Sequence, residues 1–424
     1  MMMRWPLFLV TLVAGIAWAV LRVQVPAPLP FDAPADQFSA GRAMADVRQL
    51  AAEPHPTGSP AAARVVATLE RRLAALGFAV RRVETPLPDK AAQRLRSRGG
   101  DATKPAVSLV AVRKGADSRL PAVALMAHHD SVIASPGAAD DIAGVAAVLE
   151  IARAIPAASQ RRDLVLVITD AEEQGLVGAR ALYAPGAAAD PIAGRTGVMI
   201  NLEARGGGGR TMMFQTGPNN ANLVRLLAQS SPQAAASSIA VTIYESLPND
   251  TDFTPVLKRG IAGLNFAFIG EAWAYHSPLA TPDRLEQGAL QHLGDSVLGI
   301  TRALLAAEAL PAPAPNAVFS TAPLLGLIVY PAELGWALVG AAAVLLGLAA
   351  WWRRAEWTLA GSLLAFGQAV LTLIIAGLLM WGLNLVSGSV GAEYYDRLAA
   401  LPRLELVAGL AALAALVFTA SAAA

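Results

Sequence analysis

The stretch VALMAHHDSVIASPGAADD, residues Val123 to Asp141, decides the fold. It opens with five apolar residues, as expected for a buried strand, and the sequence HHD follows them directly. A turn rich in Ser, Pro and Gly comes next, and the pair Asp140 and Asp141 then precedes an apolar helical run over residues 142–155. The stretch therefore predicts a strand, a turn and a helix, with polar groups gathered where the strand ends and the helix begins.

Each of these polar residues has an ordinary structural interpretation when it is taken alone. An aspartate often caps the start of a helix, and a histidine at a strand end is often a hydrogen-bonded structural residue. The combination is different, because the chain has only five histidines and two of them, His128 and His129, stand here beside three aspartates. We therefore interpret the stretch as part of a chemical site.

Three further apolar runs end in the same way. Their residues and the polar groups that follow them are 163–169 with Glu172 and Glu173, 197–202 with Glu203, and 263–269 with Tyr275 and His276. In an open α/β sheet the ligand crevice lies outside the carboxyl ends of the strands, so these groups can converge there. Imidazole and carboxylate ligands without thiolates suit zinc, manganese or cobalt. The residues thus predict an α/β metal hydrolase with a mixed, mostly parallel central sheet flanked by helices.

Five short motifs carry a resemblance to a known family. They are His128-x-Asp130, Gly137-Ala138-x-Asp140-Asp141, Glu172-Glu173-x-Gly175-Leu176, Asn201-Leu202-Glu203 and Tyr275-His276. In this order and spacing, over about residues 46–307, they resemble the M28 family of di-zinc peptidases. Its membrane-bound endoplasmic-reticulum members, which have a peptidase domain followed by several membrane spans, look closer to this chain than its secreted bacterial aminopeptidases do. The resemblance implies a zinc exopeptidase fold and aminopeptidase activity.

The resemblance also implies a role for each residue. Asp140 would bridge two zinc ions, with His128 and Glu203 completing one site and Glu173 and His276 the other; cobalt or manganese could replace zinc. Glu172 would be the general base. Asp130 would accept a hydrogen bond from the far ring nitrogen of His128.

Two departures from the family pattern concern the edges of the site. Many members of the family carry Asp where this chain has Glu203, and Ser is more usual where this chain has Asn249. The loop Pro248 to Phe253, reading PNDTDF, otherwise resembles that of the endoplasmic-reticulum members. From this loop and the histidine motif we predict Asp250 and Tyr275 as substrate-binding residues.

The remaining histidines are predicted to be structural. His55 lies in a turn, EPHPTGSP, that separates two predicted amphipathic helices within residues 38–76, and we expect it to be solvated rather than a metal ligand. His129 is the variable residue between two ligating positions, and His292 lies within a helical stretch. The basic, glycine-containing segment of residues 90–104 is predicted to be an exposed loop without a function.

Composition limits the partners. Of the 424 residues 55% are hydrophobic, which is too apolar for an ordinary soluble enzyme. A net charge of +1, without a basic stripe interleaved with aromatic residues, argues against nucleic-acid binding. There is no cysteine, so disulfides and thiolate zinc sites are excluded. We expect a peptide substrate and a lipid bilayer as partners.

The apolar residues gather in segments that match membrane spans. Residues 1–23 predict an uncleaved signal anchor in preference to a cleaved signal peptide, and residues 24–37 a linker. The peptidase domain is predicted over residues 38–310, a second linker over 311–330, and a membrane domain over 331–424 with three spans near 332–352, 358–386 and 404–420. Arg4, Arg353 and Arg354 lie beside these segments, so the positive-inside rule places the peptidase domain on the periplasmic or lumenal side.

The leading functional prediction is a membrane-anchored, metal-dependent aminopeptidase. A carboxypeptidase or dipeptidase of the same fold remains open as an alternative. So does a one-zinc transferase similar to glutaminyl cyclases, although the complete five-ligand set argues against it. A non-catalytic membrane scaffold or receptor is the alternative from a different functional class.

Overall fold

The computed structural model describes residues 4–185, 190–354, 358–386 and 391–422. The first three residues of the predicted signal anchor, Met1 to Met3, thus lie outside the described residues. The chain divides into two units, Met1–Glu271 with Tyr275–Pro331 and Ala272–Ala274 with Ala332–Ala424.

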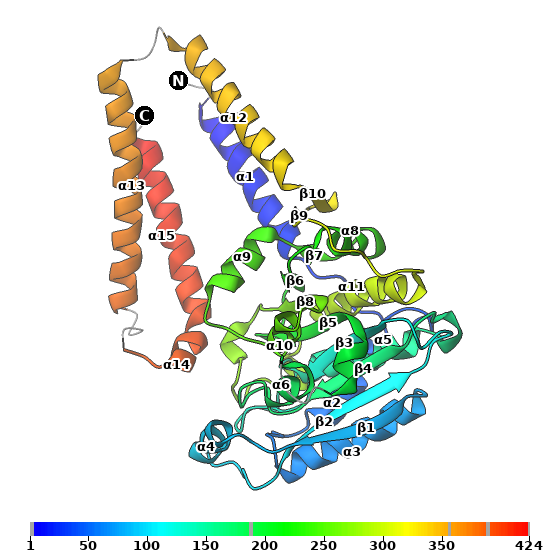
Figure 1. Ribbon diagram of the computed structural model, residues 1–424. Helices are drawn as coiled ribbons and strands as arrows, with labels where there is room; N and C mark the ends of the chain where they lie inside the picture. The colour runs from blue at the N-terminus through cyan, green and yellow to red at the C-terminus, as the bar shows by residue number, and fades with distance from the viewer. Residues whose placement is uncertain (1–3, 186–189, 355–357, 387–390, 423–424) are drawn as a thin grey trace. The chain divides into compact units, whose positions relative to one another are not determined.

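The first unit is built on an eight-stranded sheet in the order β1-β2-β4-β3-β5-β8-β6-β7 (Figure 1). The pairs β3–β4, β3–β5, β5–β8 and β6–β7 are parallel, and the pairs β1–β2, β2–β4 and β6–β8 are antiparallel. The strands are β1 (Ala79–Thr85), β2 (Ala106–Arg113), β3 (Ala122–His128), β4 (Leu164–Thr169), β5 (Thr196–Ala204), β6 (Met212–Thr216), β7 (Ala235–Ala236) and β8 (Ala262–Phe268). The predicted mixed, mostly parallel sheet is confirmed.

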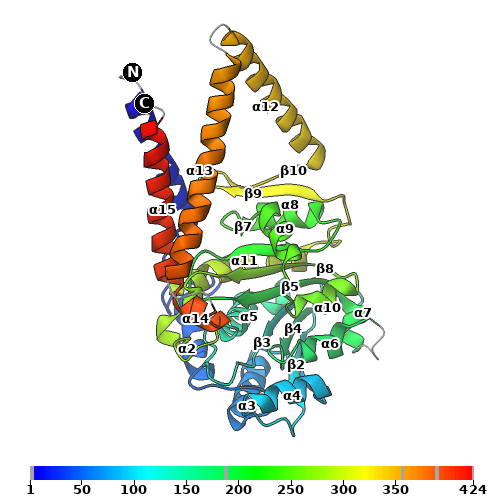
Figure 2. The same ribbon diagram turned by 90° about the vertical axis from the view of Figure 1, so that its left-hand side faces the viewer.

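Helices cover both faces of this sheet (Figure 1, Figure 2). On one face α3 (Pro60–Ala75), α5 (Ile142–Ala154) and α11 (Gln287–Ala306) pack on the strands, and α2 (Ala40–Leu50) packs on α5 and α11. On the other face lie α6 (Val177–Tyr183) and α10 (Phe253–Lys258). The further helices of this unit are α1 (Arg4–Val23), α4 (Asp89–Ser97), α7 (Pro191–Arg195), α8 (Ala221–Ser230) and α9 (Ser238–Ser246).

Successive side chains of the central strands point to opposite faces of the sheet, so the apolar core consists of two clusters. In β3, Val123, Leu125 and Ala127 belong to the apolar cluster of the α5 face, while Ala124 and Met126 belong to the cluster of the α6 face. Every residue of β3 is buried, as expected for a strand covered on both faces. This burial explains why the polar groups of the strand are confined to its carboxyl end.

The prediction of an exposed loop over residues 90–104 is wrong for the first half of this segment, which forms α4. Ala91, Ala92 and Leu95 share one side of this helix and are buried, while Lys90 and Arg94 remain exposed. The spacing of these apolar residues is helical, and the long basic residues between them are good helix formers. The sequence prediction gave weight to the many charged residues of this segment and missed the helical spacing of its apolar residues.

The predicted second linker, residues 311–330, also contains regular structure. Strands β9 (Ala317–Ala322) and β10 (Gly326–Pro331) form an antiparallel two-stranded sheet. Thr321 Oγ1 accepts a hydrogen bond from Ala236 N over 2.9 Å, which joins this sheet to β7. The first unit therefore extends to Pro331, directly before the next helix.

The second unit consists of apolar helices. α12 (Ala332–Trp352) and the segment Leu359–Leu385 within α13 (Leu359–Val386) are long and apolar enough to cross a membrane. The unit also contains α14 (Tyr394–Ala399) and α15 (Leu401–Ala422), and α15 packs against α13. The third predicted span, residues 404–420, lies within α15 and stays a prediction. The N-terminal anchor also stays a prediction, since the apolar part of α1 is the shorter segment Leu9–Val23.

Candidate metal centre

The predicted ligands come from the carboxyl ends of neighbouring parallel strands and from two loops. His128 is the last residue of β3, Glu173 follows β4, and Glu203 is the penultimate residue of β5. Asp140 lies in the turn before α5, and His276 lies in the loop after β8. The pairing of β3 with β4 and β5 therefore brings residues that are far apart in sequence to one edge of the sheet.

His128, Asp140 and Glu203 form the first group. All three residues are buried, and their nearest ligand atoms lie within 4.8 Å of one another. His128 Nε2 lies 3.1 Å from Asp140 Oδ1 and 3.9 Å from Glu203 Oε2. One imidazole nitrogen and two carboxylate oxygens thus face a common point.

Asp140, Glu173 and His276 form the second group, in which the ligand atoms are again within 4.8 Å of one another. His276 Nε2 lies 2.9 Å from Asp140 Oδ2 and 2.8 Å from Glu173 Oε1. Asp140 thus presents one carboxylate oxygen to each group. The structure brings together all five residues that the sequence predicts as ligands, in the two predicted sets.

The chemistry of the donors fits two divalent cations. The groups offer only imidazole nitrogens and carboxylate oxygens, which are ligands that zinc accepts. Glu173 Oε1 is buried, and it lies 2.8 Å from His276 Nε2, which is itself a candidate ligand atom. Several buried carboxylates close together are costly unless positive charge lies between them. The first group therefore suits one ion and the second group another, with Asp140 common to both.

The acidic groups strongly perturb one another. Burial raises the pKa of Glu203 to about 8 and is reinforced by Asp140 and Asp252, although His128 opposes it. Burial also raises the pKa of Glu172 well above its ordinary value, and Glu203 and Glu173 add to the effect. Carboxylates crowd in this way at sites that are completed by positive charge.

Asp130 connects the two halves of the site. Its Oδ1 lies 3.4 Å from His128 Nδ1 and accepts a hydrogen bond of 3.0 Å from Glu172 N. Its Oδ2 accepts a hydrogen bond of 3.2 Å from Glu173 N. Asp130 therefore holds the ring of His128, whose Nδ1 lies 3.0 Å from the Asp130 backbone oxygen, and its carboxylate fixes the backbone of the loop that carries Glu172 and Glu173.

Asp141 and Asn201 hold the other side. Asp141 Oδ1 accepts a hydrogen bond from Gly144 N and so caps α5, while its Oδ2 accepts one of 3.1 Å from His128 N. Asn201 Nδ2 donates to Glu203 Oε1 over 3.3 Å and to Asn265 Oδ1 over 3.0 Å. These contacts fix the orientation of the ligands, as partners outside the ligand set commonly do in metal sites.

The loop with the sequence PNDTDF places its two aspartates differently. Asp250 is exposed, and its Oδ1 accepts a hydrogen bond from Thr254 Oγ1 over 3.1 Å. Asp252 is buried and accepts a hydrogen bond from Thr169 Oγ1, and its Oδ1 has no partner among the described residues. Burial raises the pKa of Asp252 to about 6. The sequence prediction named Asp250, the exposed aspartate of this loop, and did not name the buried Asp252.

Tyr275 lies directly on a ligand. Its ring stacks on that of His276 with the centroids 3.7 Å apart and the planes at 18°. Burial raises the pKa of the Tyr275 hydroxyl, and Asp140 and Glu173 add to the effect, so this group stays protonated. Tyr275 thus lies beside the second group, and its role in substrate binding stays a prediction.

The other histidines lie outside the two groups. The prediction that His55 is solvated is wrong, since this residue is buried. The loop around it packs against the loop after β3, where His55 N donates a hydrogen bond to Ser131 Oγ over 3.0 Å. Burial lowers its pKa to about 4. The rings of His129 and His292 approach the backbone oxygens of Val107 and Gln233, at 3.0 and 2.8 Å. All three have structural contacts.

Comparison with known proteins identifies the domain. Residues 108–301, which contain all five predicted ligands, match the family described as "Peptidase family M28". This domain belongs to peptidase family M28. The chain is 33% identical over 223 residues to "Endoplasmic reticulum metallopeptidase 1" of Homo sapiens and 28% identical over 215 residues to "Vacuolar membrane protease" of Yarrowia lipolytica.

These matches cover only part of the relatives. They include 50% and 49% of this chain but 24% and 20% of the human and yeast proteins, so the chain matches a quarter or less of their length. Among solved structures, "Aminopeptidase from Aneurinibacillus sp. strain AM-1" has a TM-score of 0.50 at 16% identity, covering 70% of this chain and 98% of that one. This similarity confirms the zinc exopeptidase fold of the M28 domain.

Proposed function

We propose that the chain is a metal-dependent aminopeptidase that removes residues from the amino terminus of peptides. The observation that carries the proposal is the pair of three-residue groups that share Asp140, with Glu172 directly before the ligand Glu173. The human relative is named a metallopeptidase, and the structural relative an aminopeptidase. Both names agree with hydrolysis of a peptide bond at this site.

In this proposal His128, Asp140 and Glu203 hold one zinc ion, and Asp140, Glu173 and His276 hold the other. Cobalt or manganese suits the same donors. A pair of such ions lowers the pKa of water and polarises the carbonyl group of a peptide bond. Hydrogen bonds with Asp130, Asp141 and Asn201 hold the surrounding side chains and backbone in place.

Glu172 is the proposed general base. Its carboxylate takes a proton from the attacking water and returns it to the nitrogen of the leaving peptide. Its backbone N–H donates to Asp130 Oδ1, which fixes the start of the loop. Burial and neighbouring carboxylates favour the protonated form of Glu172, and two cations beside it favour the ionised form. These opposing effects suit a group that must both accept and release a proton.

Asp130 is a proposed positioning residue, and Asp130→Asn is expected to weaken metal binding by about 10–100-fold. The new side-chain amide must turn its NH₂ group towards His128 or towards the backbone N–H of Glu172 or Glu173, so one hydrogen bond is lost. Titration of the metal-free protein against a chelating indicator measures the change. Asp117→Asn, at an exposed ion pair with Arg119, is the matched control. Unchanged metal affinity in Asp130→Asn would remove this role.

The substrate side of the proposal rests on fewer contacts. Tyr275, stacked on His276, is proposed to contact the bound peptide, and exposed Asp250 is proposed to contact it at the rim. A carboxypeptidase or dipeptidase would use the same two metal groups, and a scaffold would use neither. The deciding observation is therefore which end of a peptide must be free.

Hydrolysis of amino-acid amidomethylcoumarins by the detergent-purified protein tests the function. We expect cleavage of substrates with a free amine, no cleavage of N-acetylated controls, loss of activity with chelator and recovery with zinc. Cleavage only of peptides with a free carboxyl terminus would instead indicate a carboxypeptidase. Protein that binds no metal would indicate a scaffold.

We also propose that the domain is held at a membrane with its active site on the non-cytoplasmic side. The apolar helix α12 begins one residue after β10 ends, so the M28 domain leads directly into a segment that can span a bilayer. Arg353 and Arg354 follow this helix, and such residues favour the cytoplasmic side. The other end of α12, which carries the M28 domain, then faces the periplasm or a lumen.

A further inference from the structure

A pocket is formed in part by the loop that follows the predicted base Glu172 and the ligand Glu173. It has a volume of about 460 Å³, within the range of small-ligand sites. It is formed by α4, by residues from the end of β1, and by the loop and helix that follow Glu173. Pro88, Ala91 and Val177 give it an apolar floor. We refer to it as the cationic pocket, because Lys90, Arg94 and Arg180 line it.

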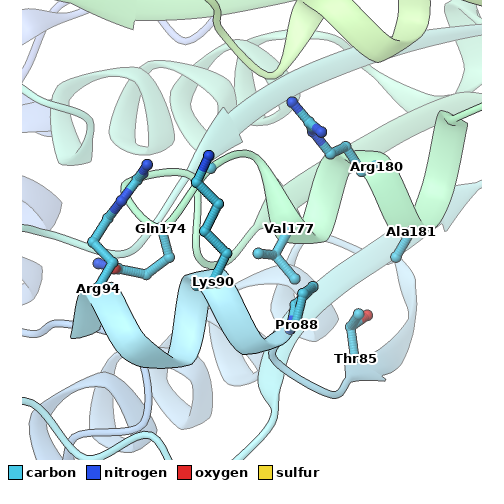
Figure 3. A pocket seen from close by; sticks show the side chains of 10 residues that line it. Thr85, Pro88, Lys90, Arg94, Gln174, Val177, Arg180 and Ala181 are labelled. Atoms are coloured by element: carbon cyan, nitrogen blue, oxygen red, sulfur yellow. The ribbon is translucent and has the colours of Figure 1, made fainter. Parts of the chain in front are cut away.

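No acid is among the residues that line the cationic pocket. Figure 3 shows Lys90 and Arg94 extending from α4 and Arg180 from α6, with their charged ends above the apolar residues. Among the residues that the structure describes, none of the three lies within ion-pair distance of a carboxylate, although many other arginines of this domain do. Three like charges around one pocket repel one another unless an anion joins them.

Gln174 provides an independent indication of a ligand. It is 5% exposed, its Oε1 is buried without a hydrogen-bond partner, and it lines the cationic pocket between α4 and α6 (Figure 3). A side-chain amide has two donors and an acceptor, and buried amides are normally paired. The wall of the pocket thus contains an unpaired amide beside its positively charged rim.

The position of the cationic pocket links it to the metal centre. Thr85 pairs with Ala106, the first residue of β2. Because β2 runs antiparallel to β4, the start of β2 lies at the same edge of the sheet as the carboxyl end of β4, where the loop with Glu172 and Glu173 begins. Gln174 follows Glu173 directly, and adjacent Cα atoms are only about 3.8 Å apart. A single loop therefore carries the base and a metal ligand, and also forms a wall of the pocket.

We propose that the cationic pocket binds a carboxylate on the leaving part of the peptide and thereby selects acidic peptides. The carboxylate contacts Arg94 and Arg180 at the rim, and the Gln174 amide turns its NH₂ group, not the unpaired Oε1, towards it. An extended peptide advances about 3.3 Å per residue, so a residue shortly after the cleaved bond can reach the pocket. The inference rests on the proposed aminopeptidase function. The carboxylate is either an acidic side chain or the carboxyl terminus of a short peptide.

Four peptides separate these sources: Ala-Ala-Ala-Ala amide, Ala-Ala-Glu-Ala amide, Ala-Ala-Ala-Ala with a free carboxyl terminus, and Glu-Ala-Ala-Ala amide. We expect kcat/KM of the full-length protein for the second or the third peptide to exceed that for the first by about tenfold or more, the effect of one charged hydrogen bond. The peptide that gains identifies the source. Equal values for the first three peptides, or a gain for the fourth alone, would overturn the proposal.

The double variant Arg94→Gln/Arg180→Gln tests the residues. Its ratio of kcat/KM for acidic over neutral peptide is expected to fall close to one. The matched control is Arg96→Gln/Arg98→Gln, which removes two exposed charges from the same segment but none from the pocket. If the control lowers the ratio as much, the selectivity comes from net charge and the pocket assignment fails.

Direct binding separates the failure of the pocket from the failure of the function. Calorimetric titration of Glu172→Gln with Ala-Ala-Glu-Ala amide needs no turnover, and binding that weakens about tenfold in the pocket variant supports the pocket even if no peptide is cleaved. Binding that is equally strong with and without Arg94 and Arg180 would overturn it. If no peptide is cleaved by protein that holds two metal ions, the aminopeptidase proposal fails, whatever the titration shows.

Discussion

Glu172→Gln is expected to lower kcat by about a hundredfold to ten-thousandfold while the protein keeps both metal ions. Glutamine has nearly the same shape but cannot accept the proton of the attacking water. Glu172 belongs to neither metal group, so the ligand sets are intact in this variant. The backbone N–H that Glu172 donates to Asp130 is also unchanged. The measurements are the turnover of a free-amine substrate and the metal content of the purified variant.

Two further variants make the result specific to this carboxylate. Glu308→Gln makes the same chemical change at an exposed position outside the site, and it is expected to have normal activity. Glu173→Gln alters the adjacent residue, and it is expected to lose one ion together with activity. If Glu172→Gln lost metal as Glu173→Gln does, Glu172 would be a ligand and not a base. Normal turnover in Glu172→Gln would require another base.

The strand ends were predictable because buried parallel strands have a simple sequence pattern. Residues 163–169 and 197–202 are almost wholly apolar, so the first carboxylates after them mark where the chain leaves the core. Their convergence follows from the parallel pairing of β3 with β4 and β5. The assignment of particular residues to the two metal groups came from the family resemblance, since spacing along the chain cannot show which side chains face each other.

The features that the sequence did not predict depend on tertiary packing. α4 has a net positive sequence, and it becomes recognisable as a helix only through the burial of Ala91, Ala92 and Leu95. His55 lies in a Pro- and Gly-containing turn that would be exposed in isolation, but the loop after β3 covers it. Asp250 and Asp252 are two residues apart, and only contact with Thr169 on β4 distinguishes the buried aspartate from the exposed one.

Asp140→Asn is expected to remove both metal ions and all measurable peptidase activity. Asp140 belongs to both groups, with Oδ1 3.1 Å from His128 Nε2 and Oδ2 2.9 Å from His276 Nε2. An asparagine must present its NH₂ group, a donor without a lone pair for a metal, to one of the two groups. It also removes the negative charge that both ions share. Mass-spectrometric metal analysis after gel filtration measures the loss.

Comparing the metal content of Asp140→Asn with that of His276→Ala tests whether Asp140 is a ligand of both ions. His276 belongs to one group only, so its removal is expected to leave one ion per chain, whereas Asp140→Asn leaves close to none. Since an ion bound only by the folded state stabilises it, thermal unfolding should follow the same order: wild type, then His276→Ala, then Asp140→Asn and the chelated wild type together. Circular dichroism shows whether each variant is folded. If folded Asp140→Asn kept two ions, the two groups would bind metal without a shared carboxylate. The role of Asp140 as a bridging ligand would then be wrong.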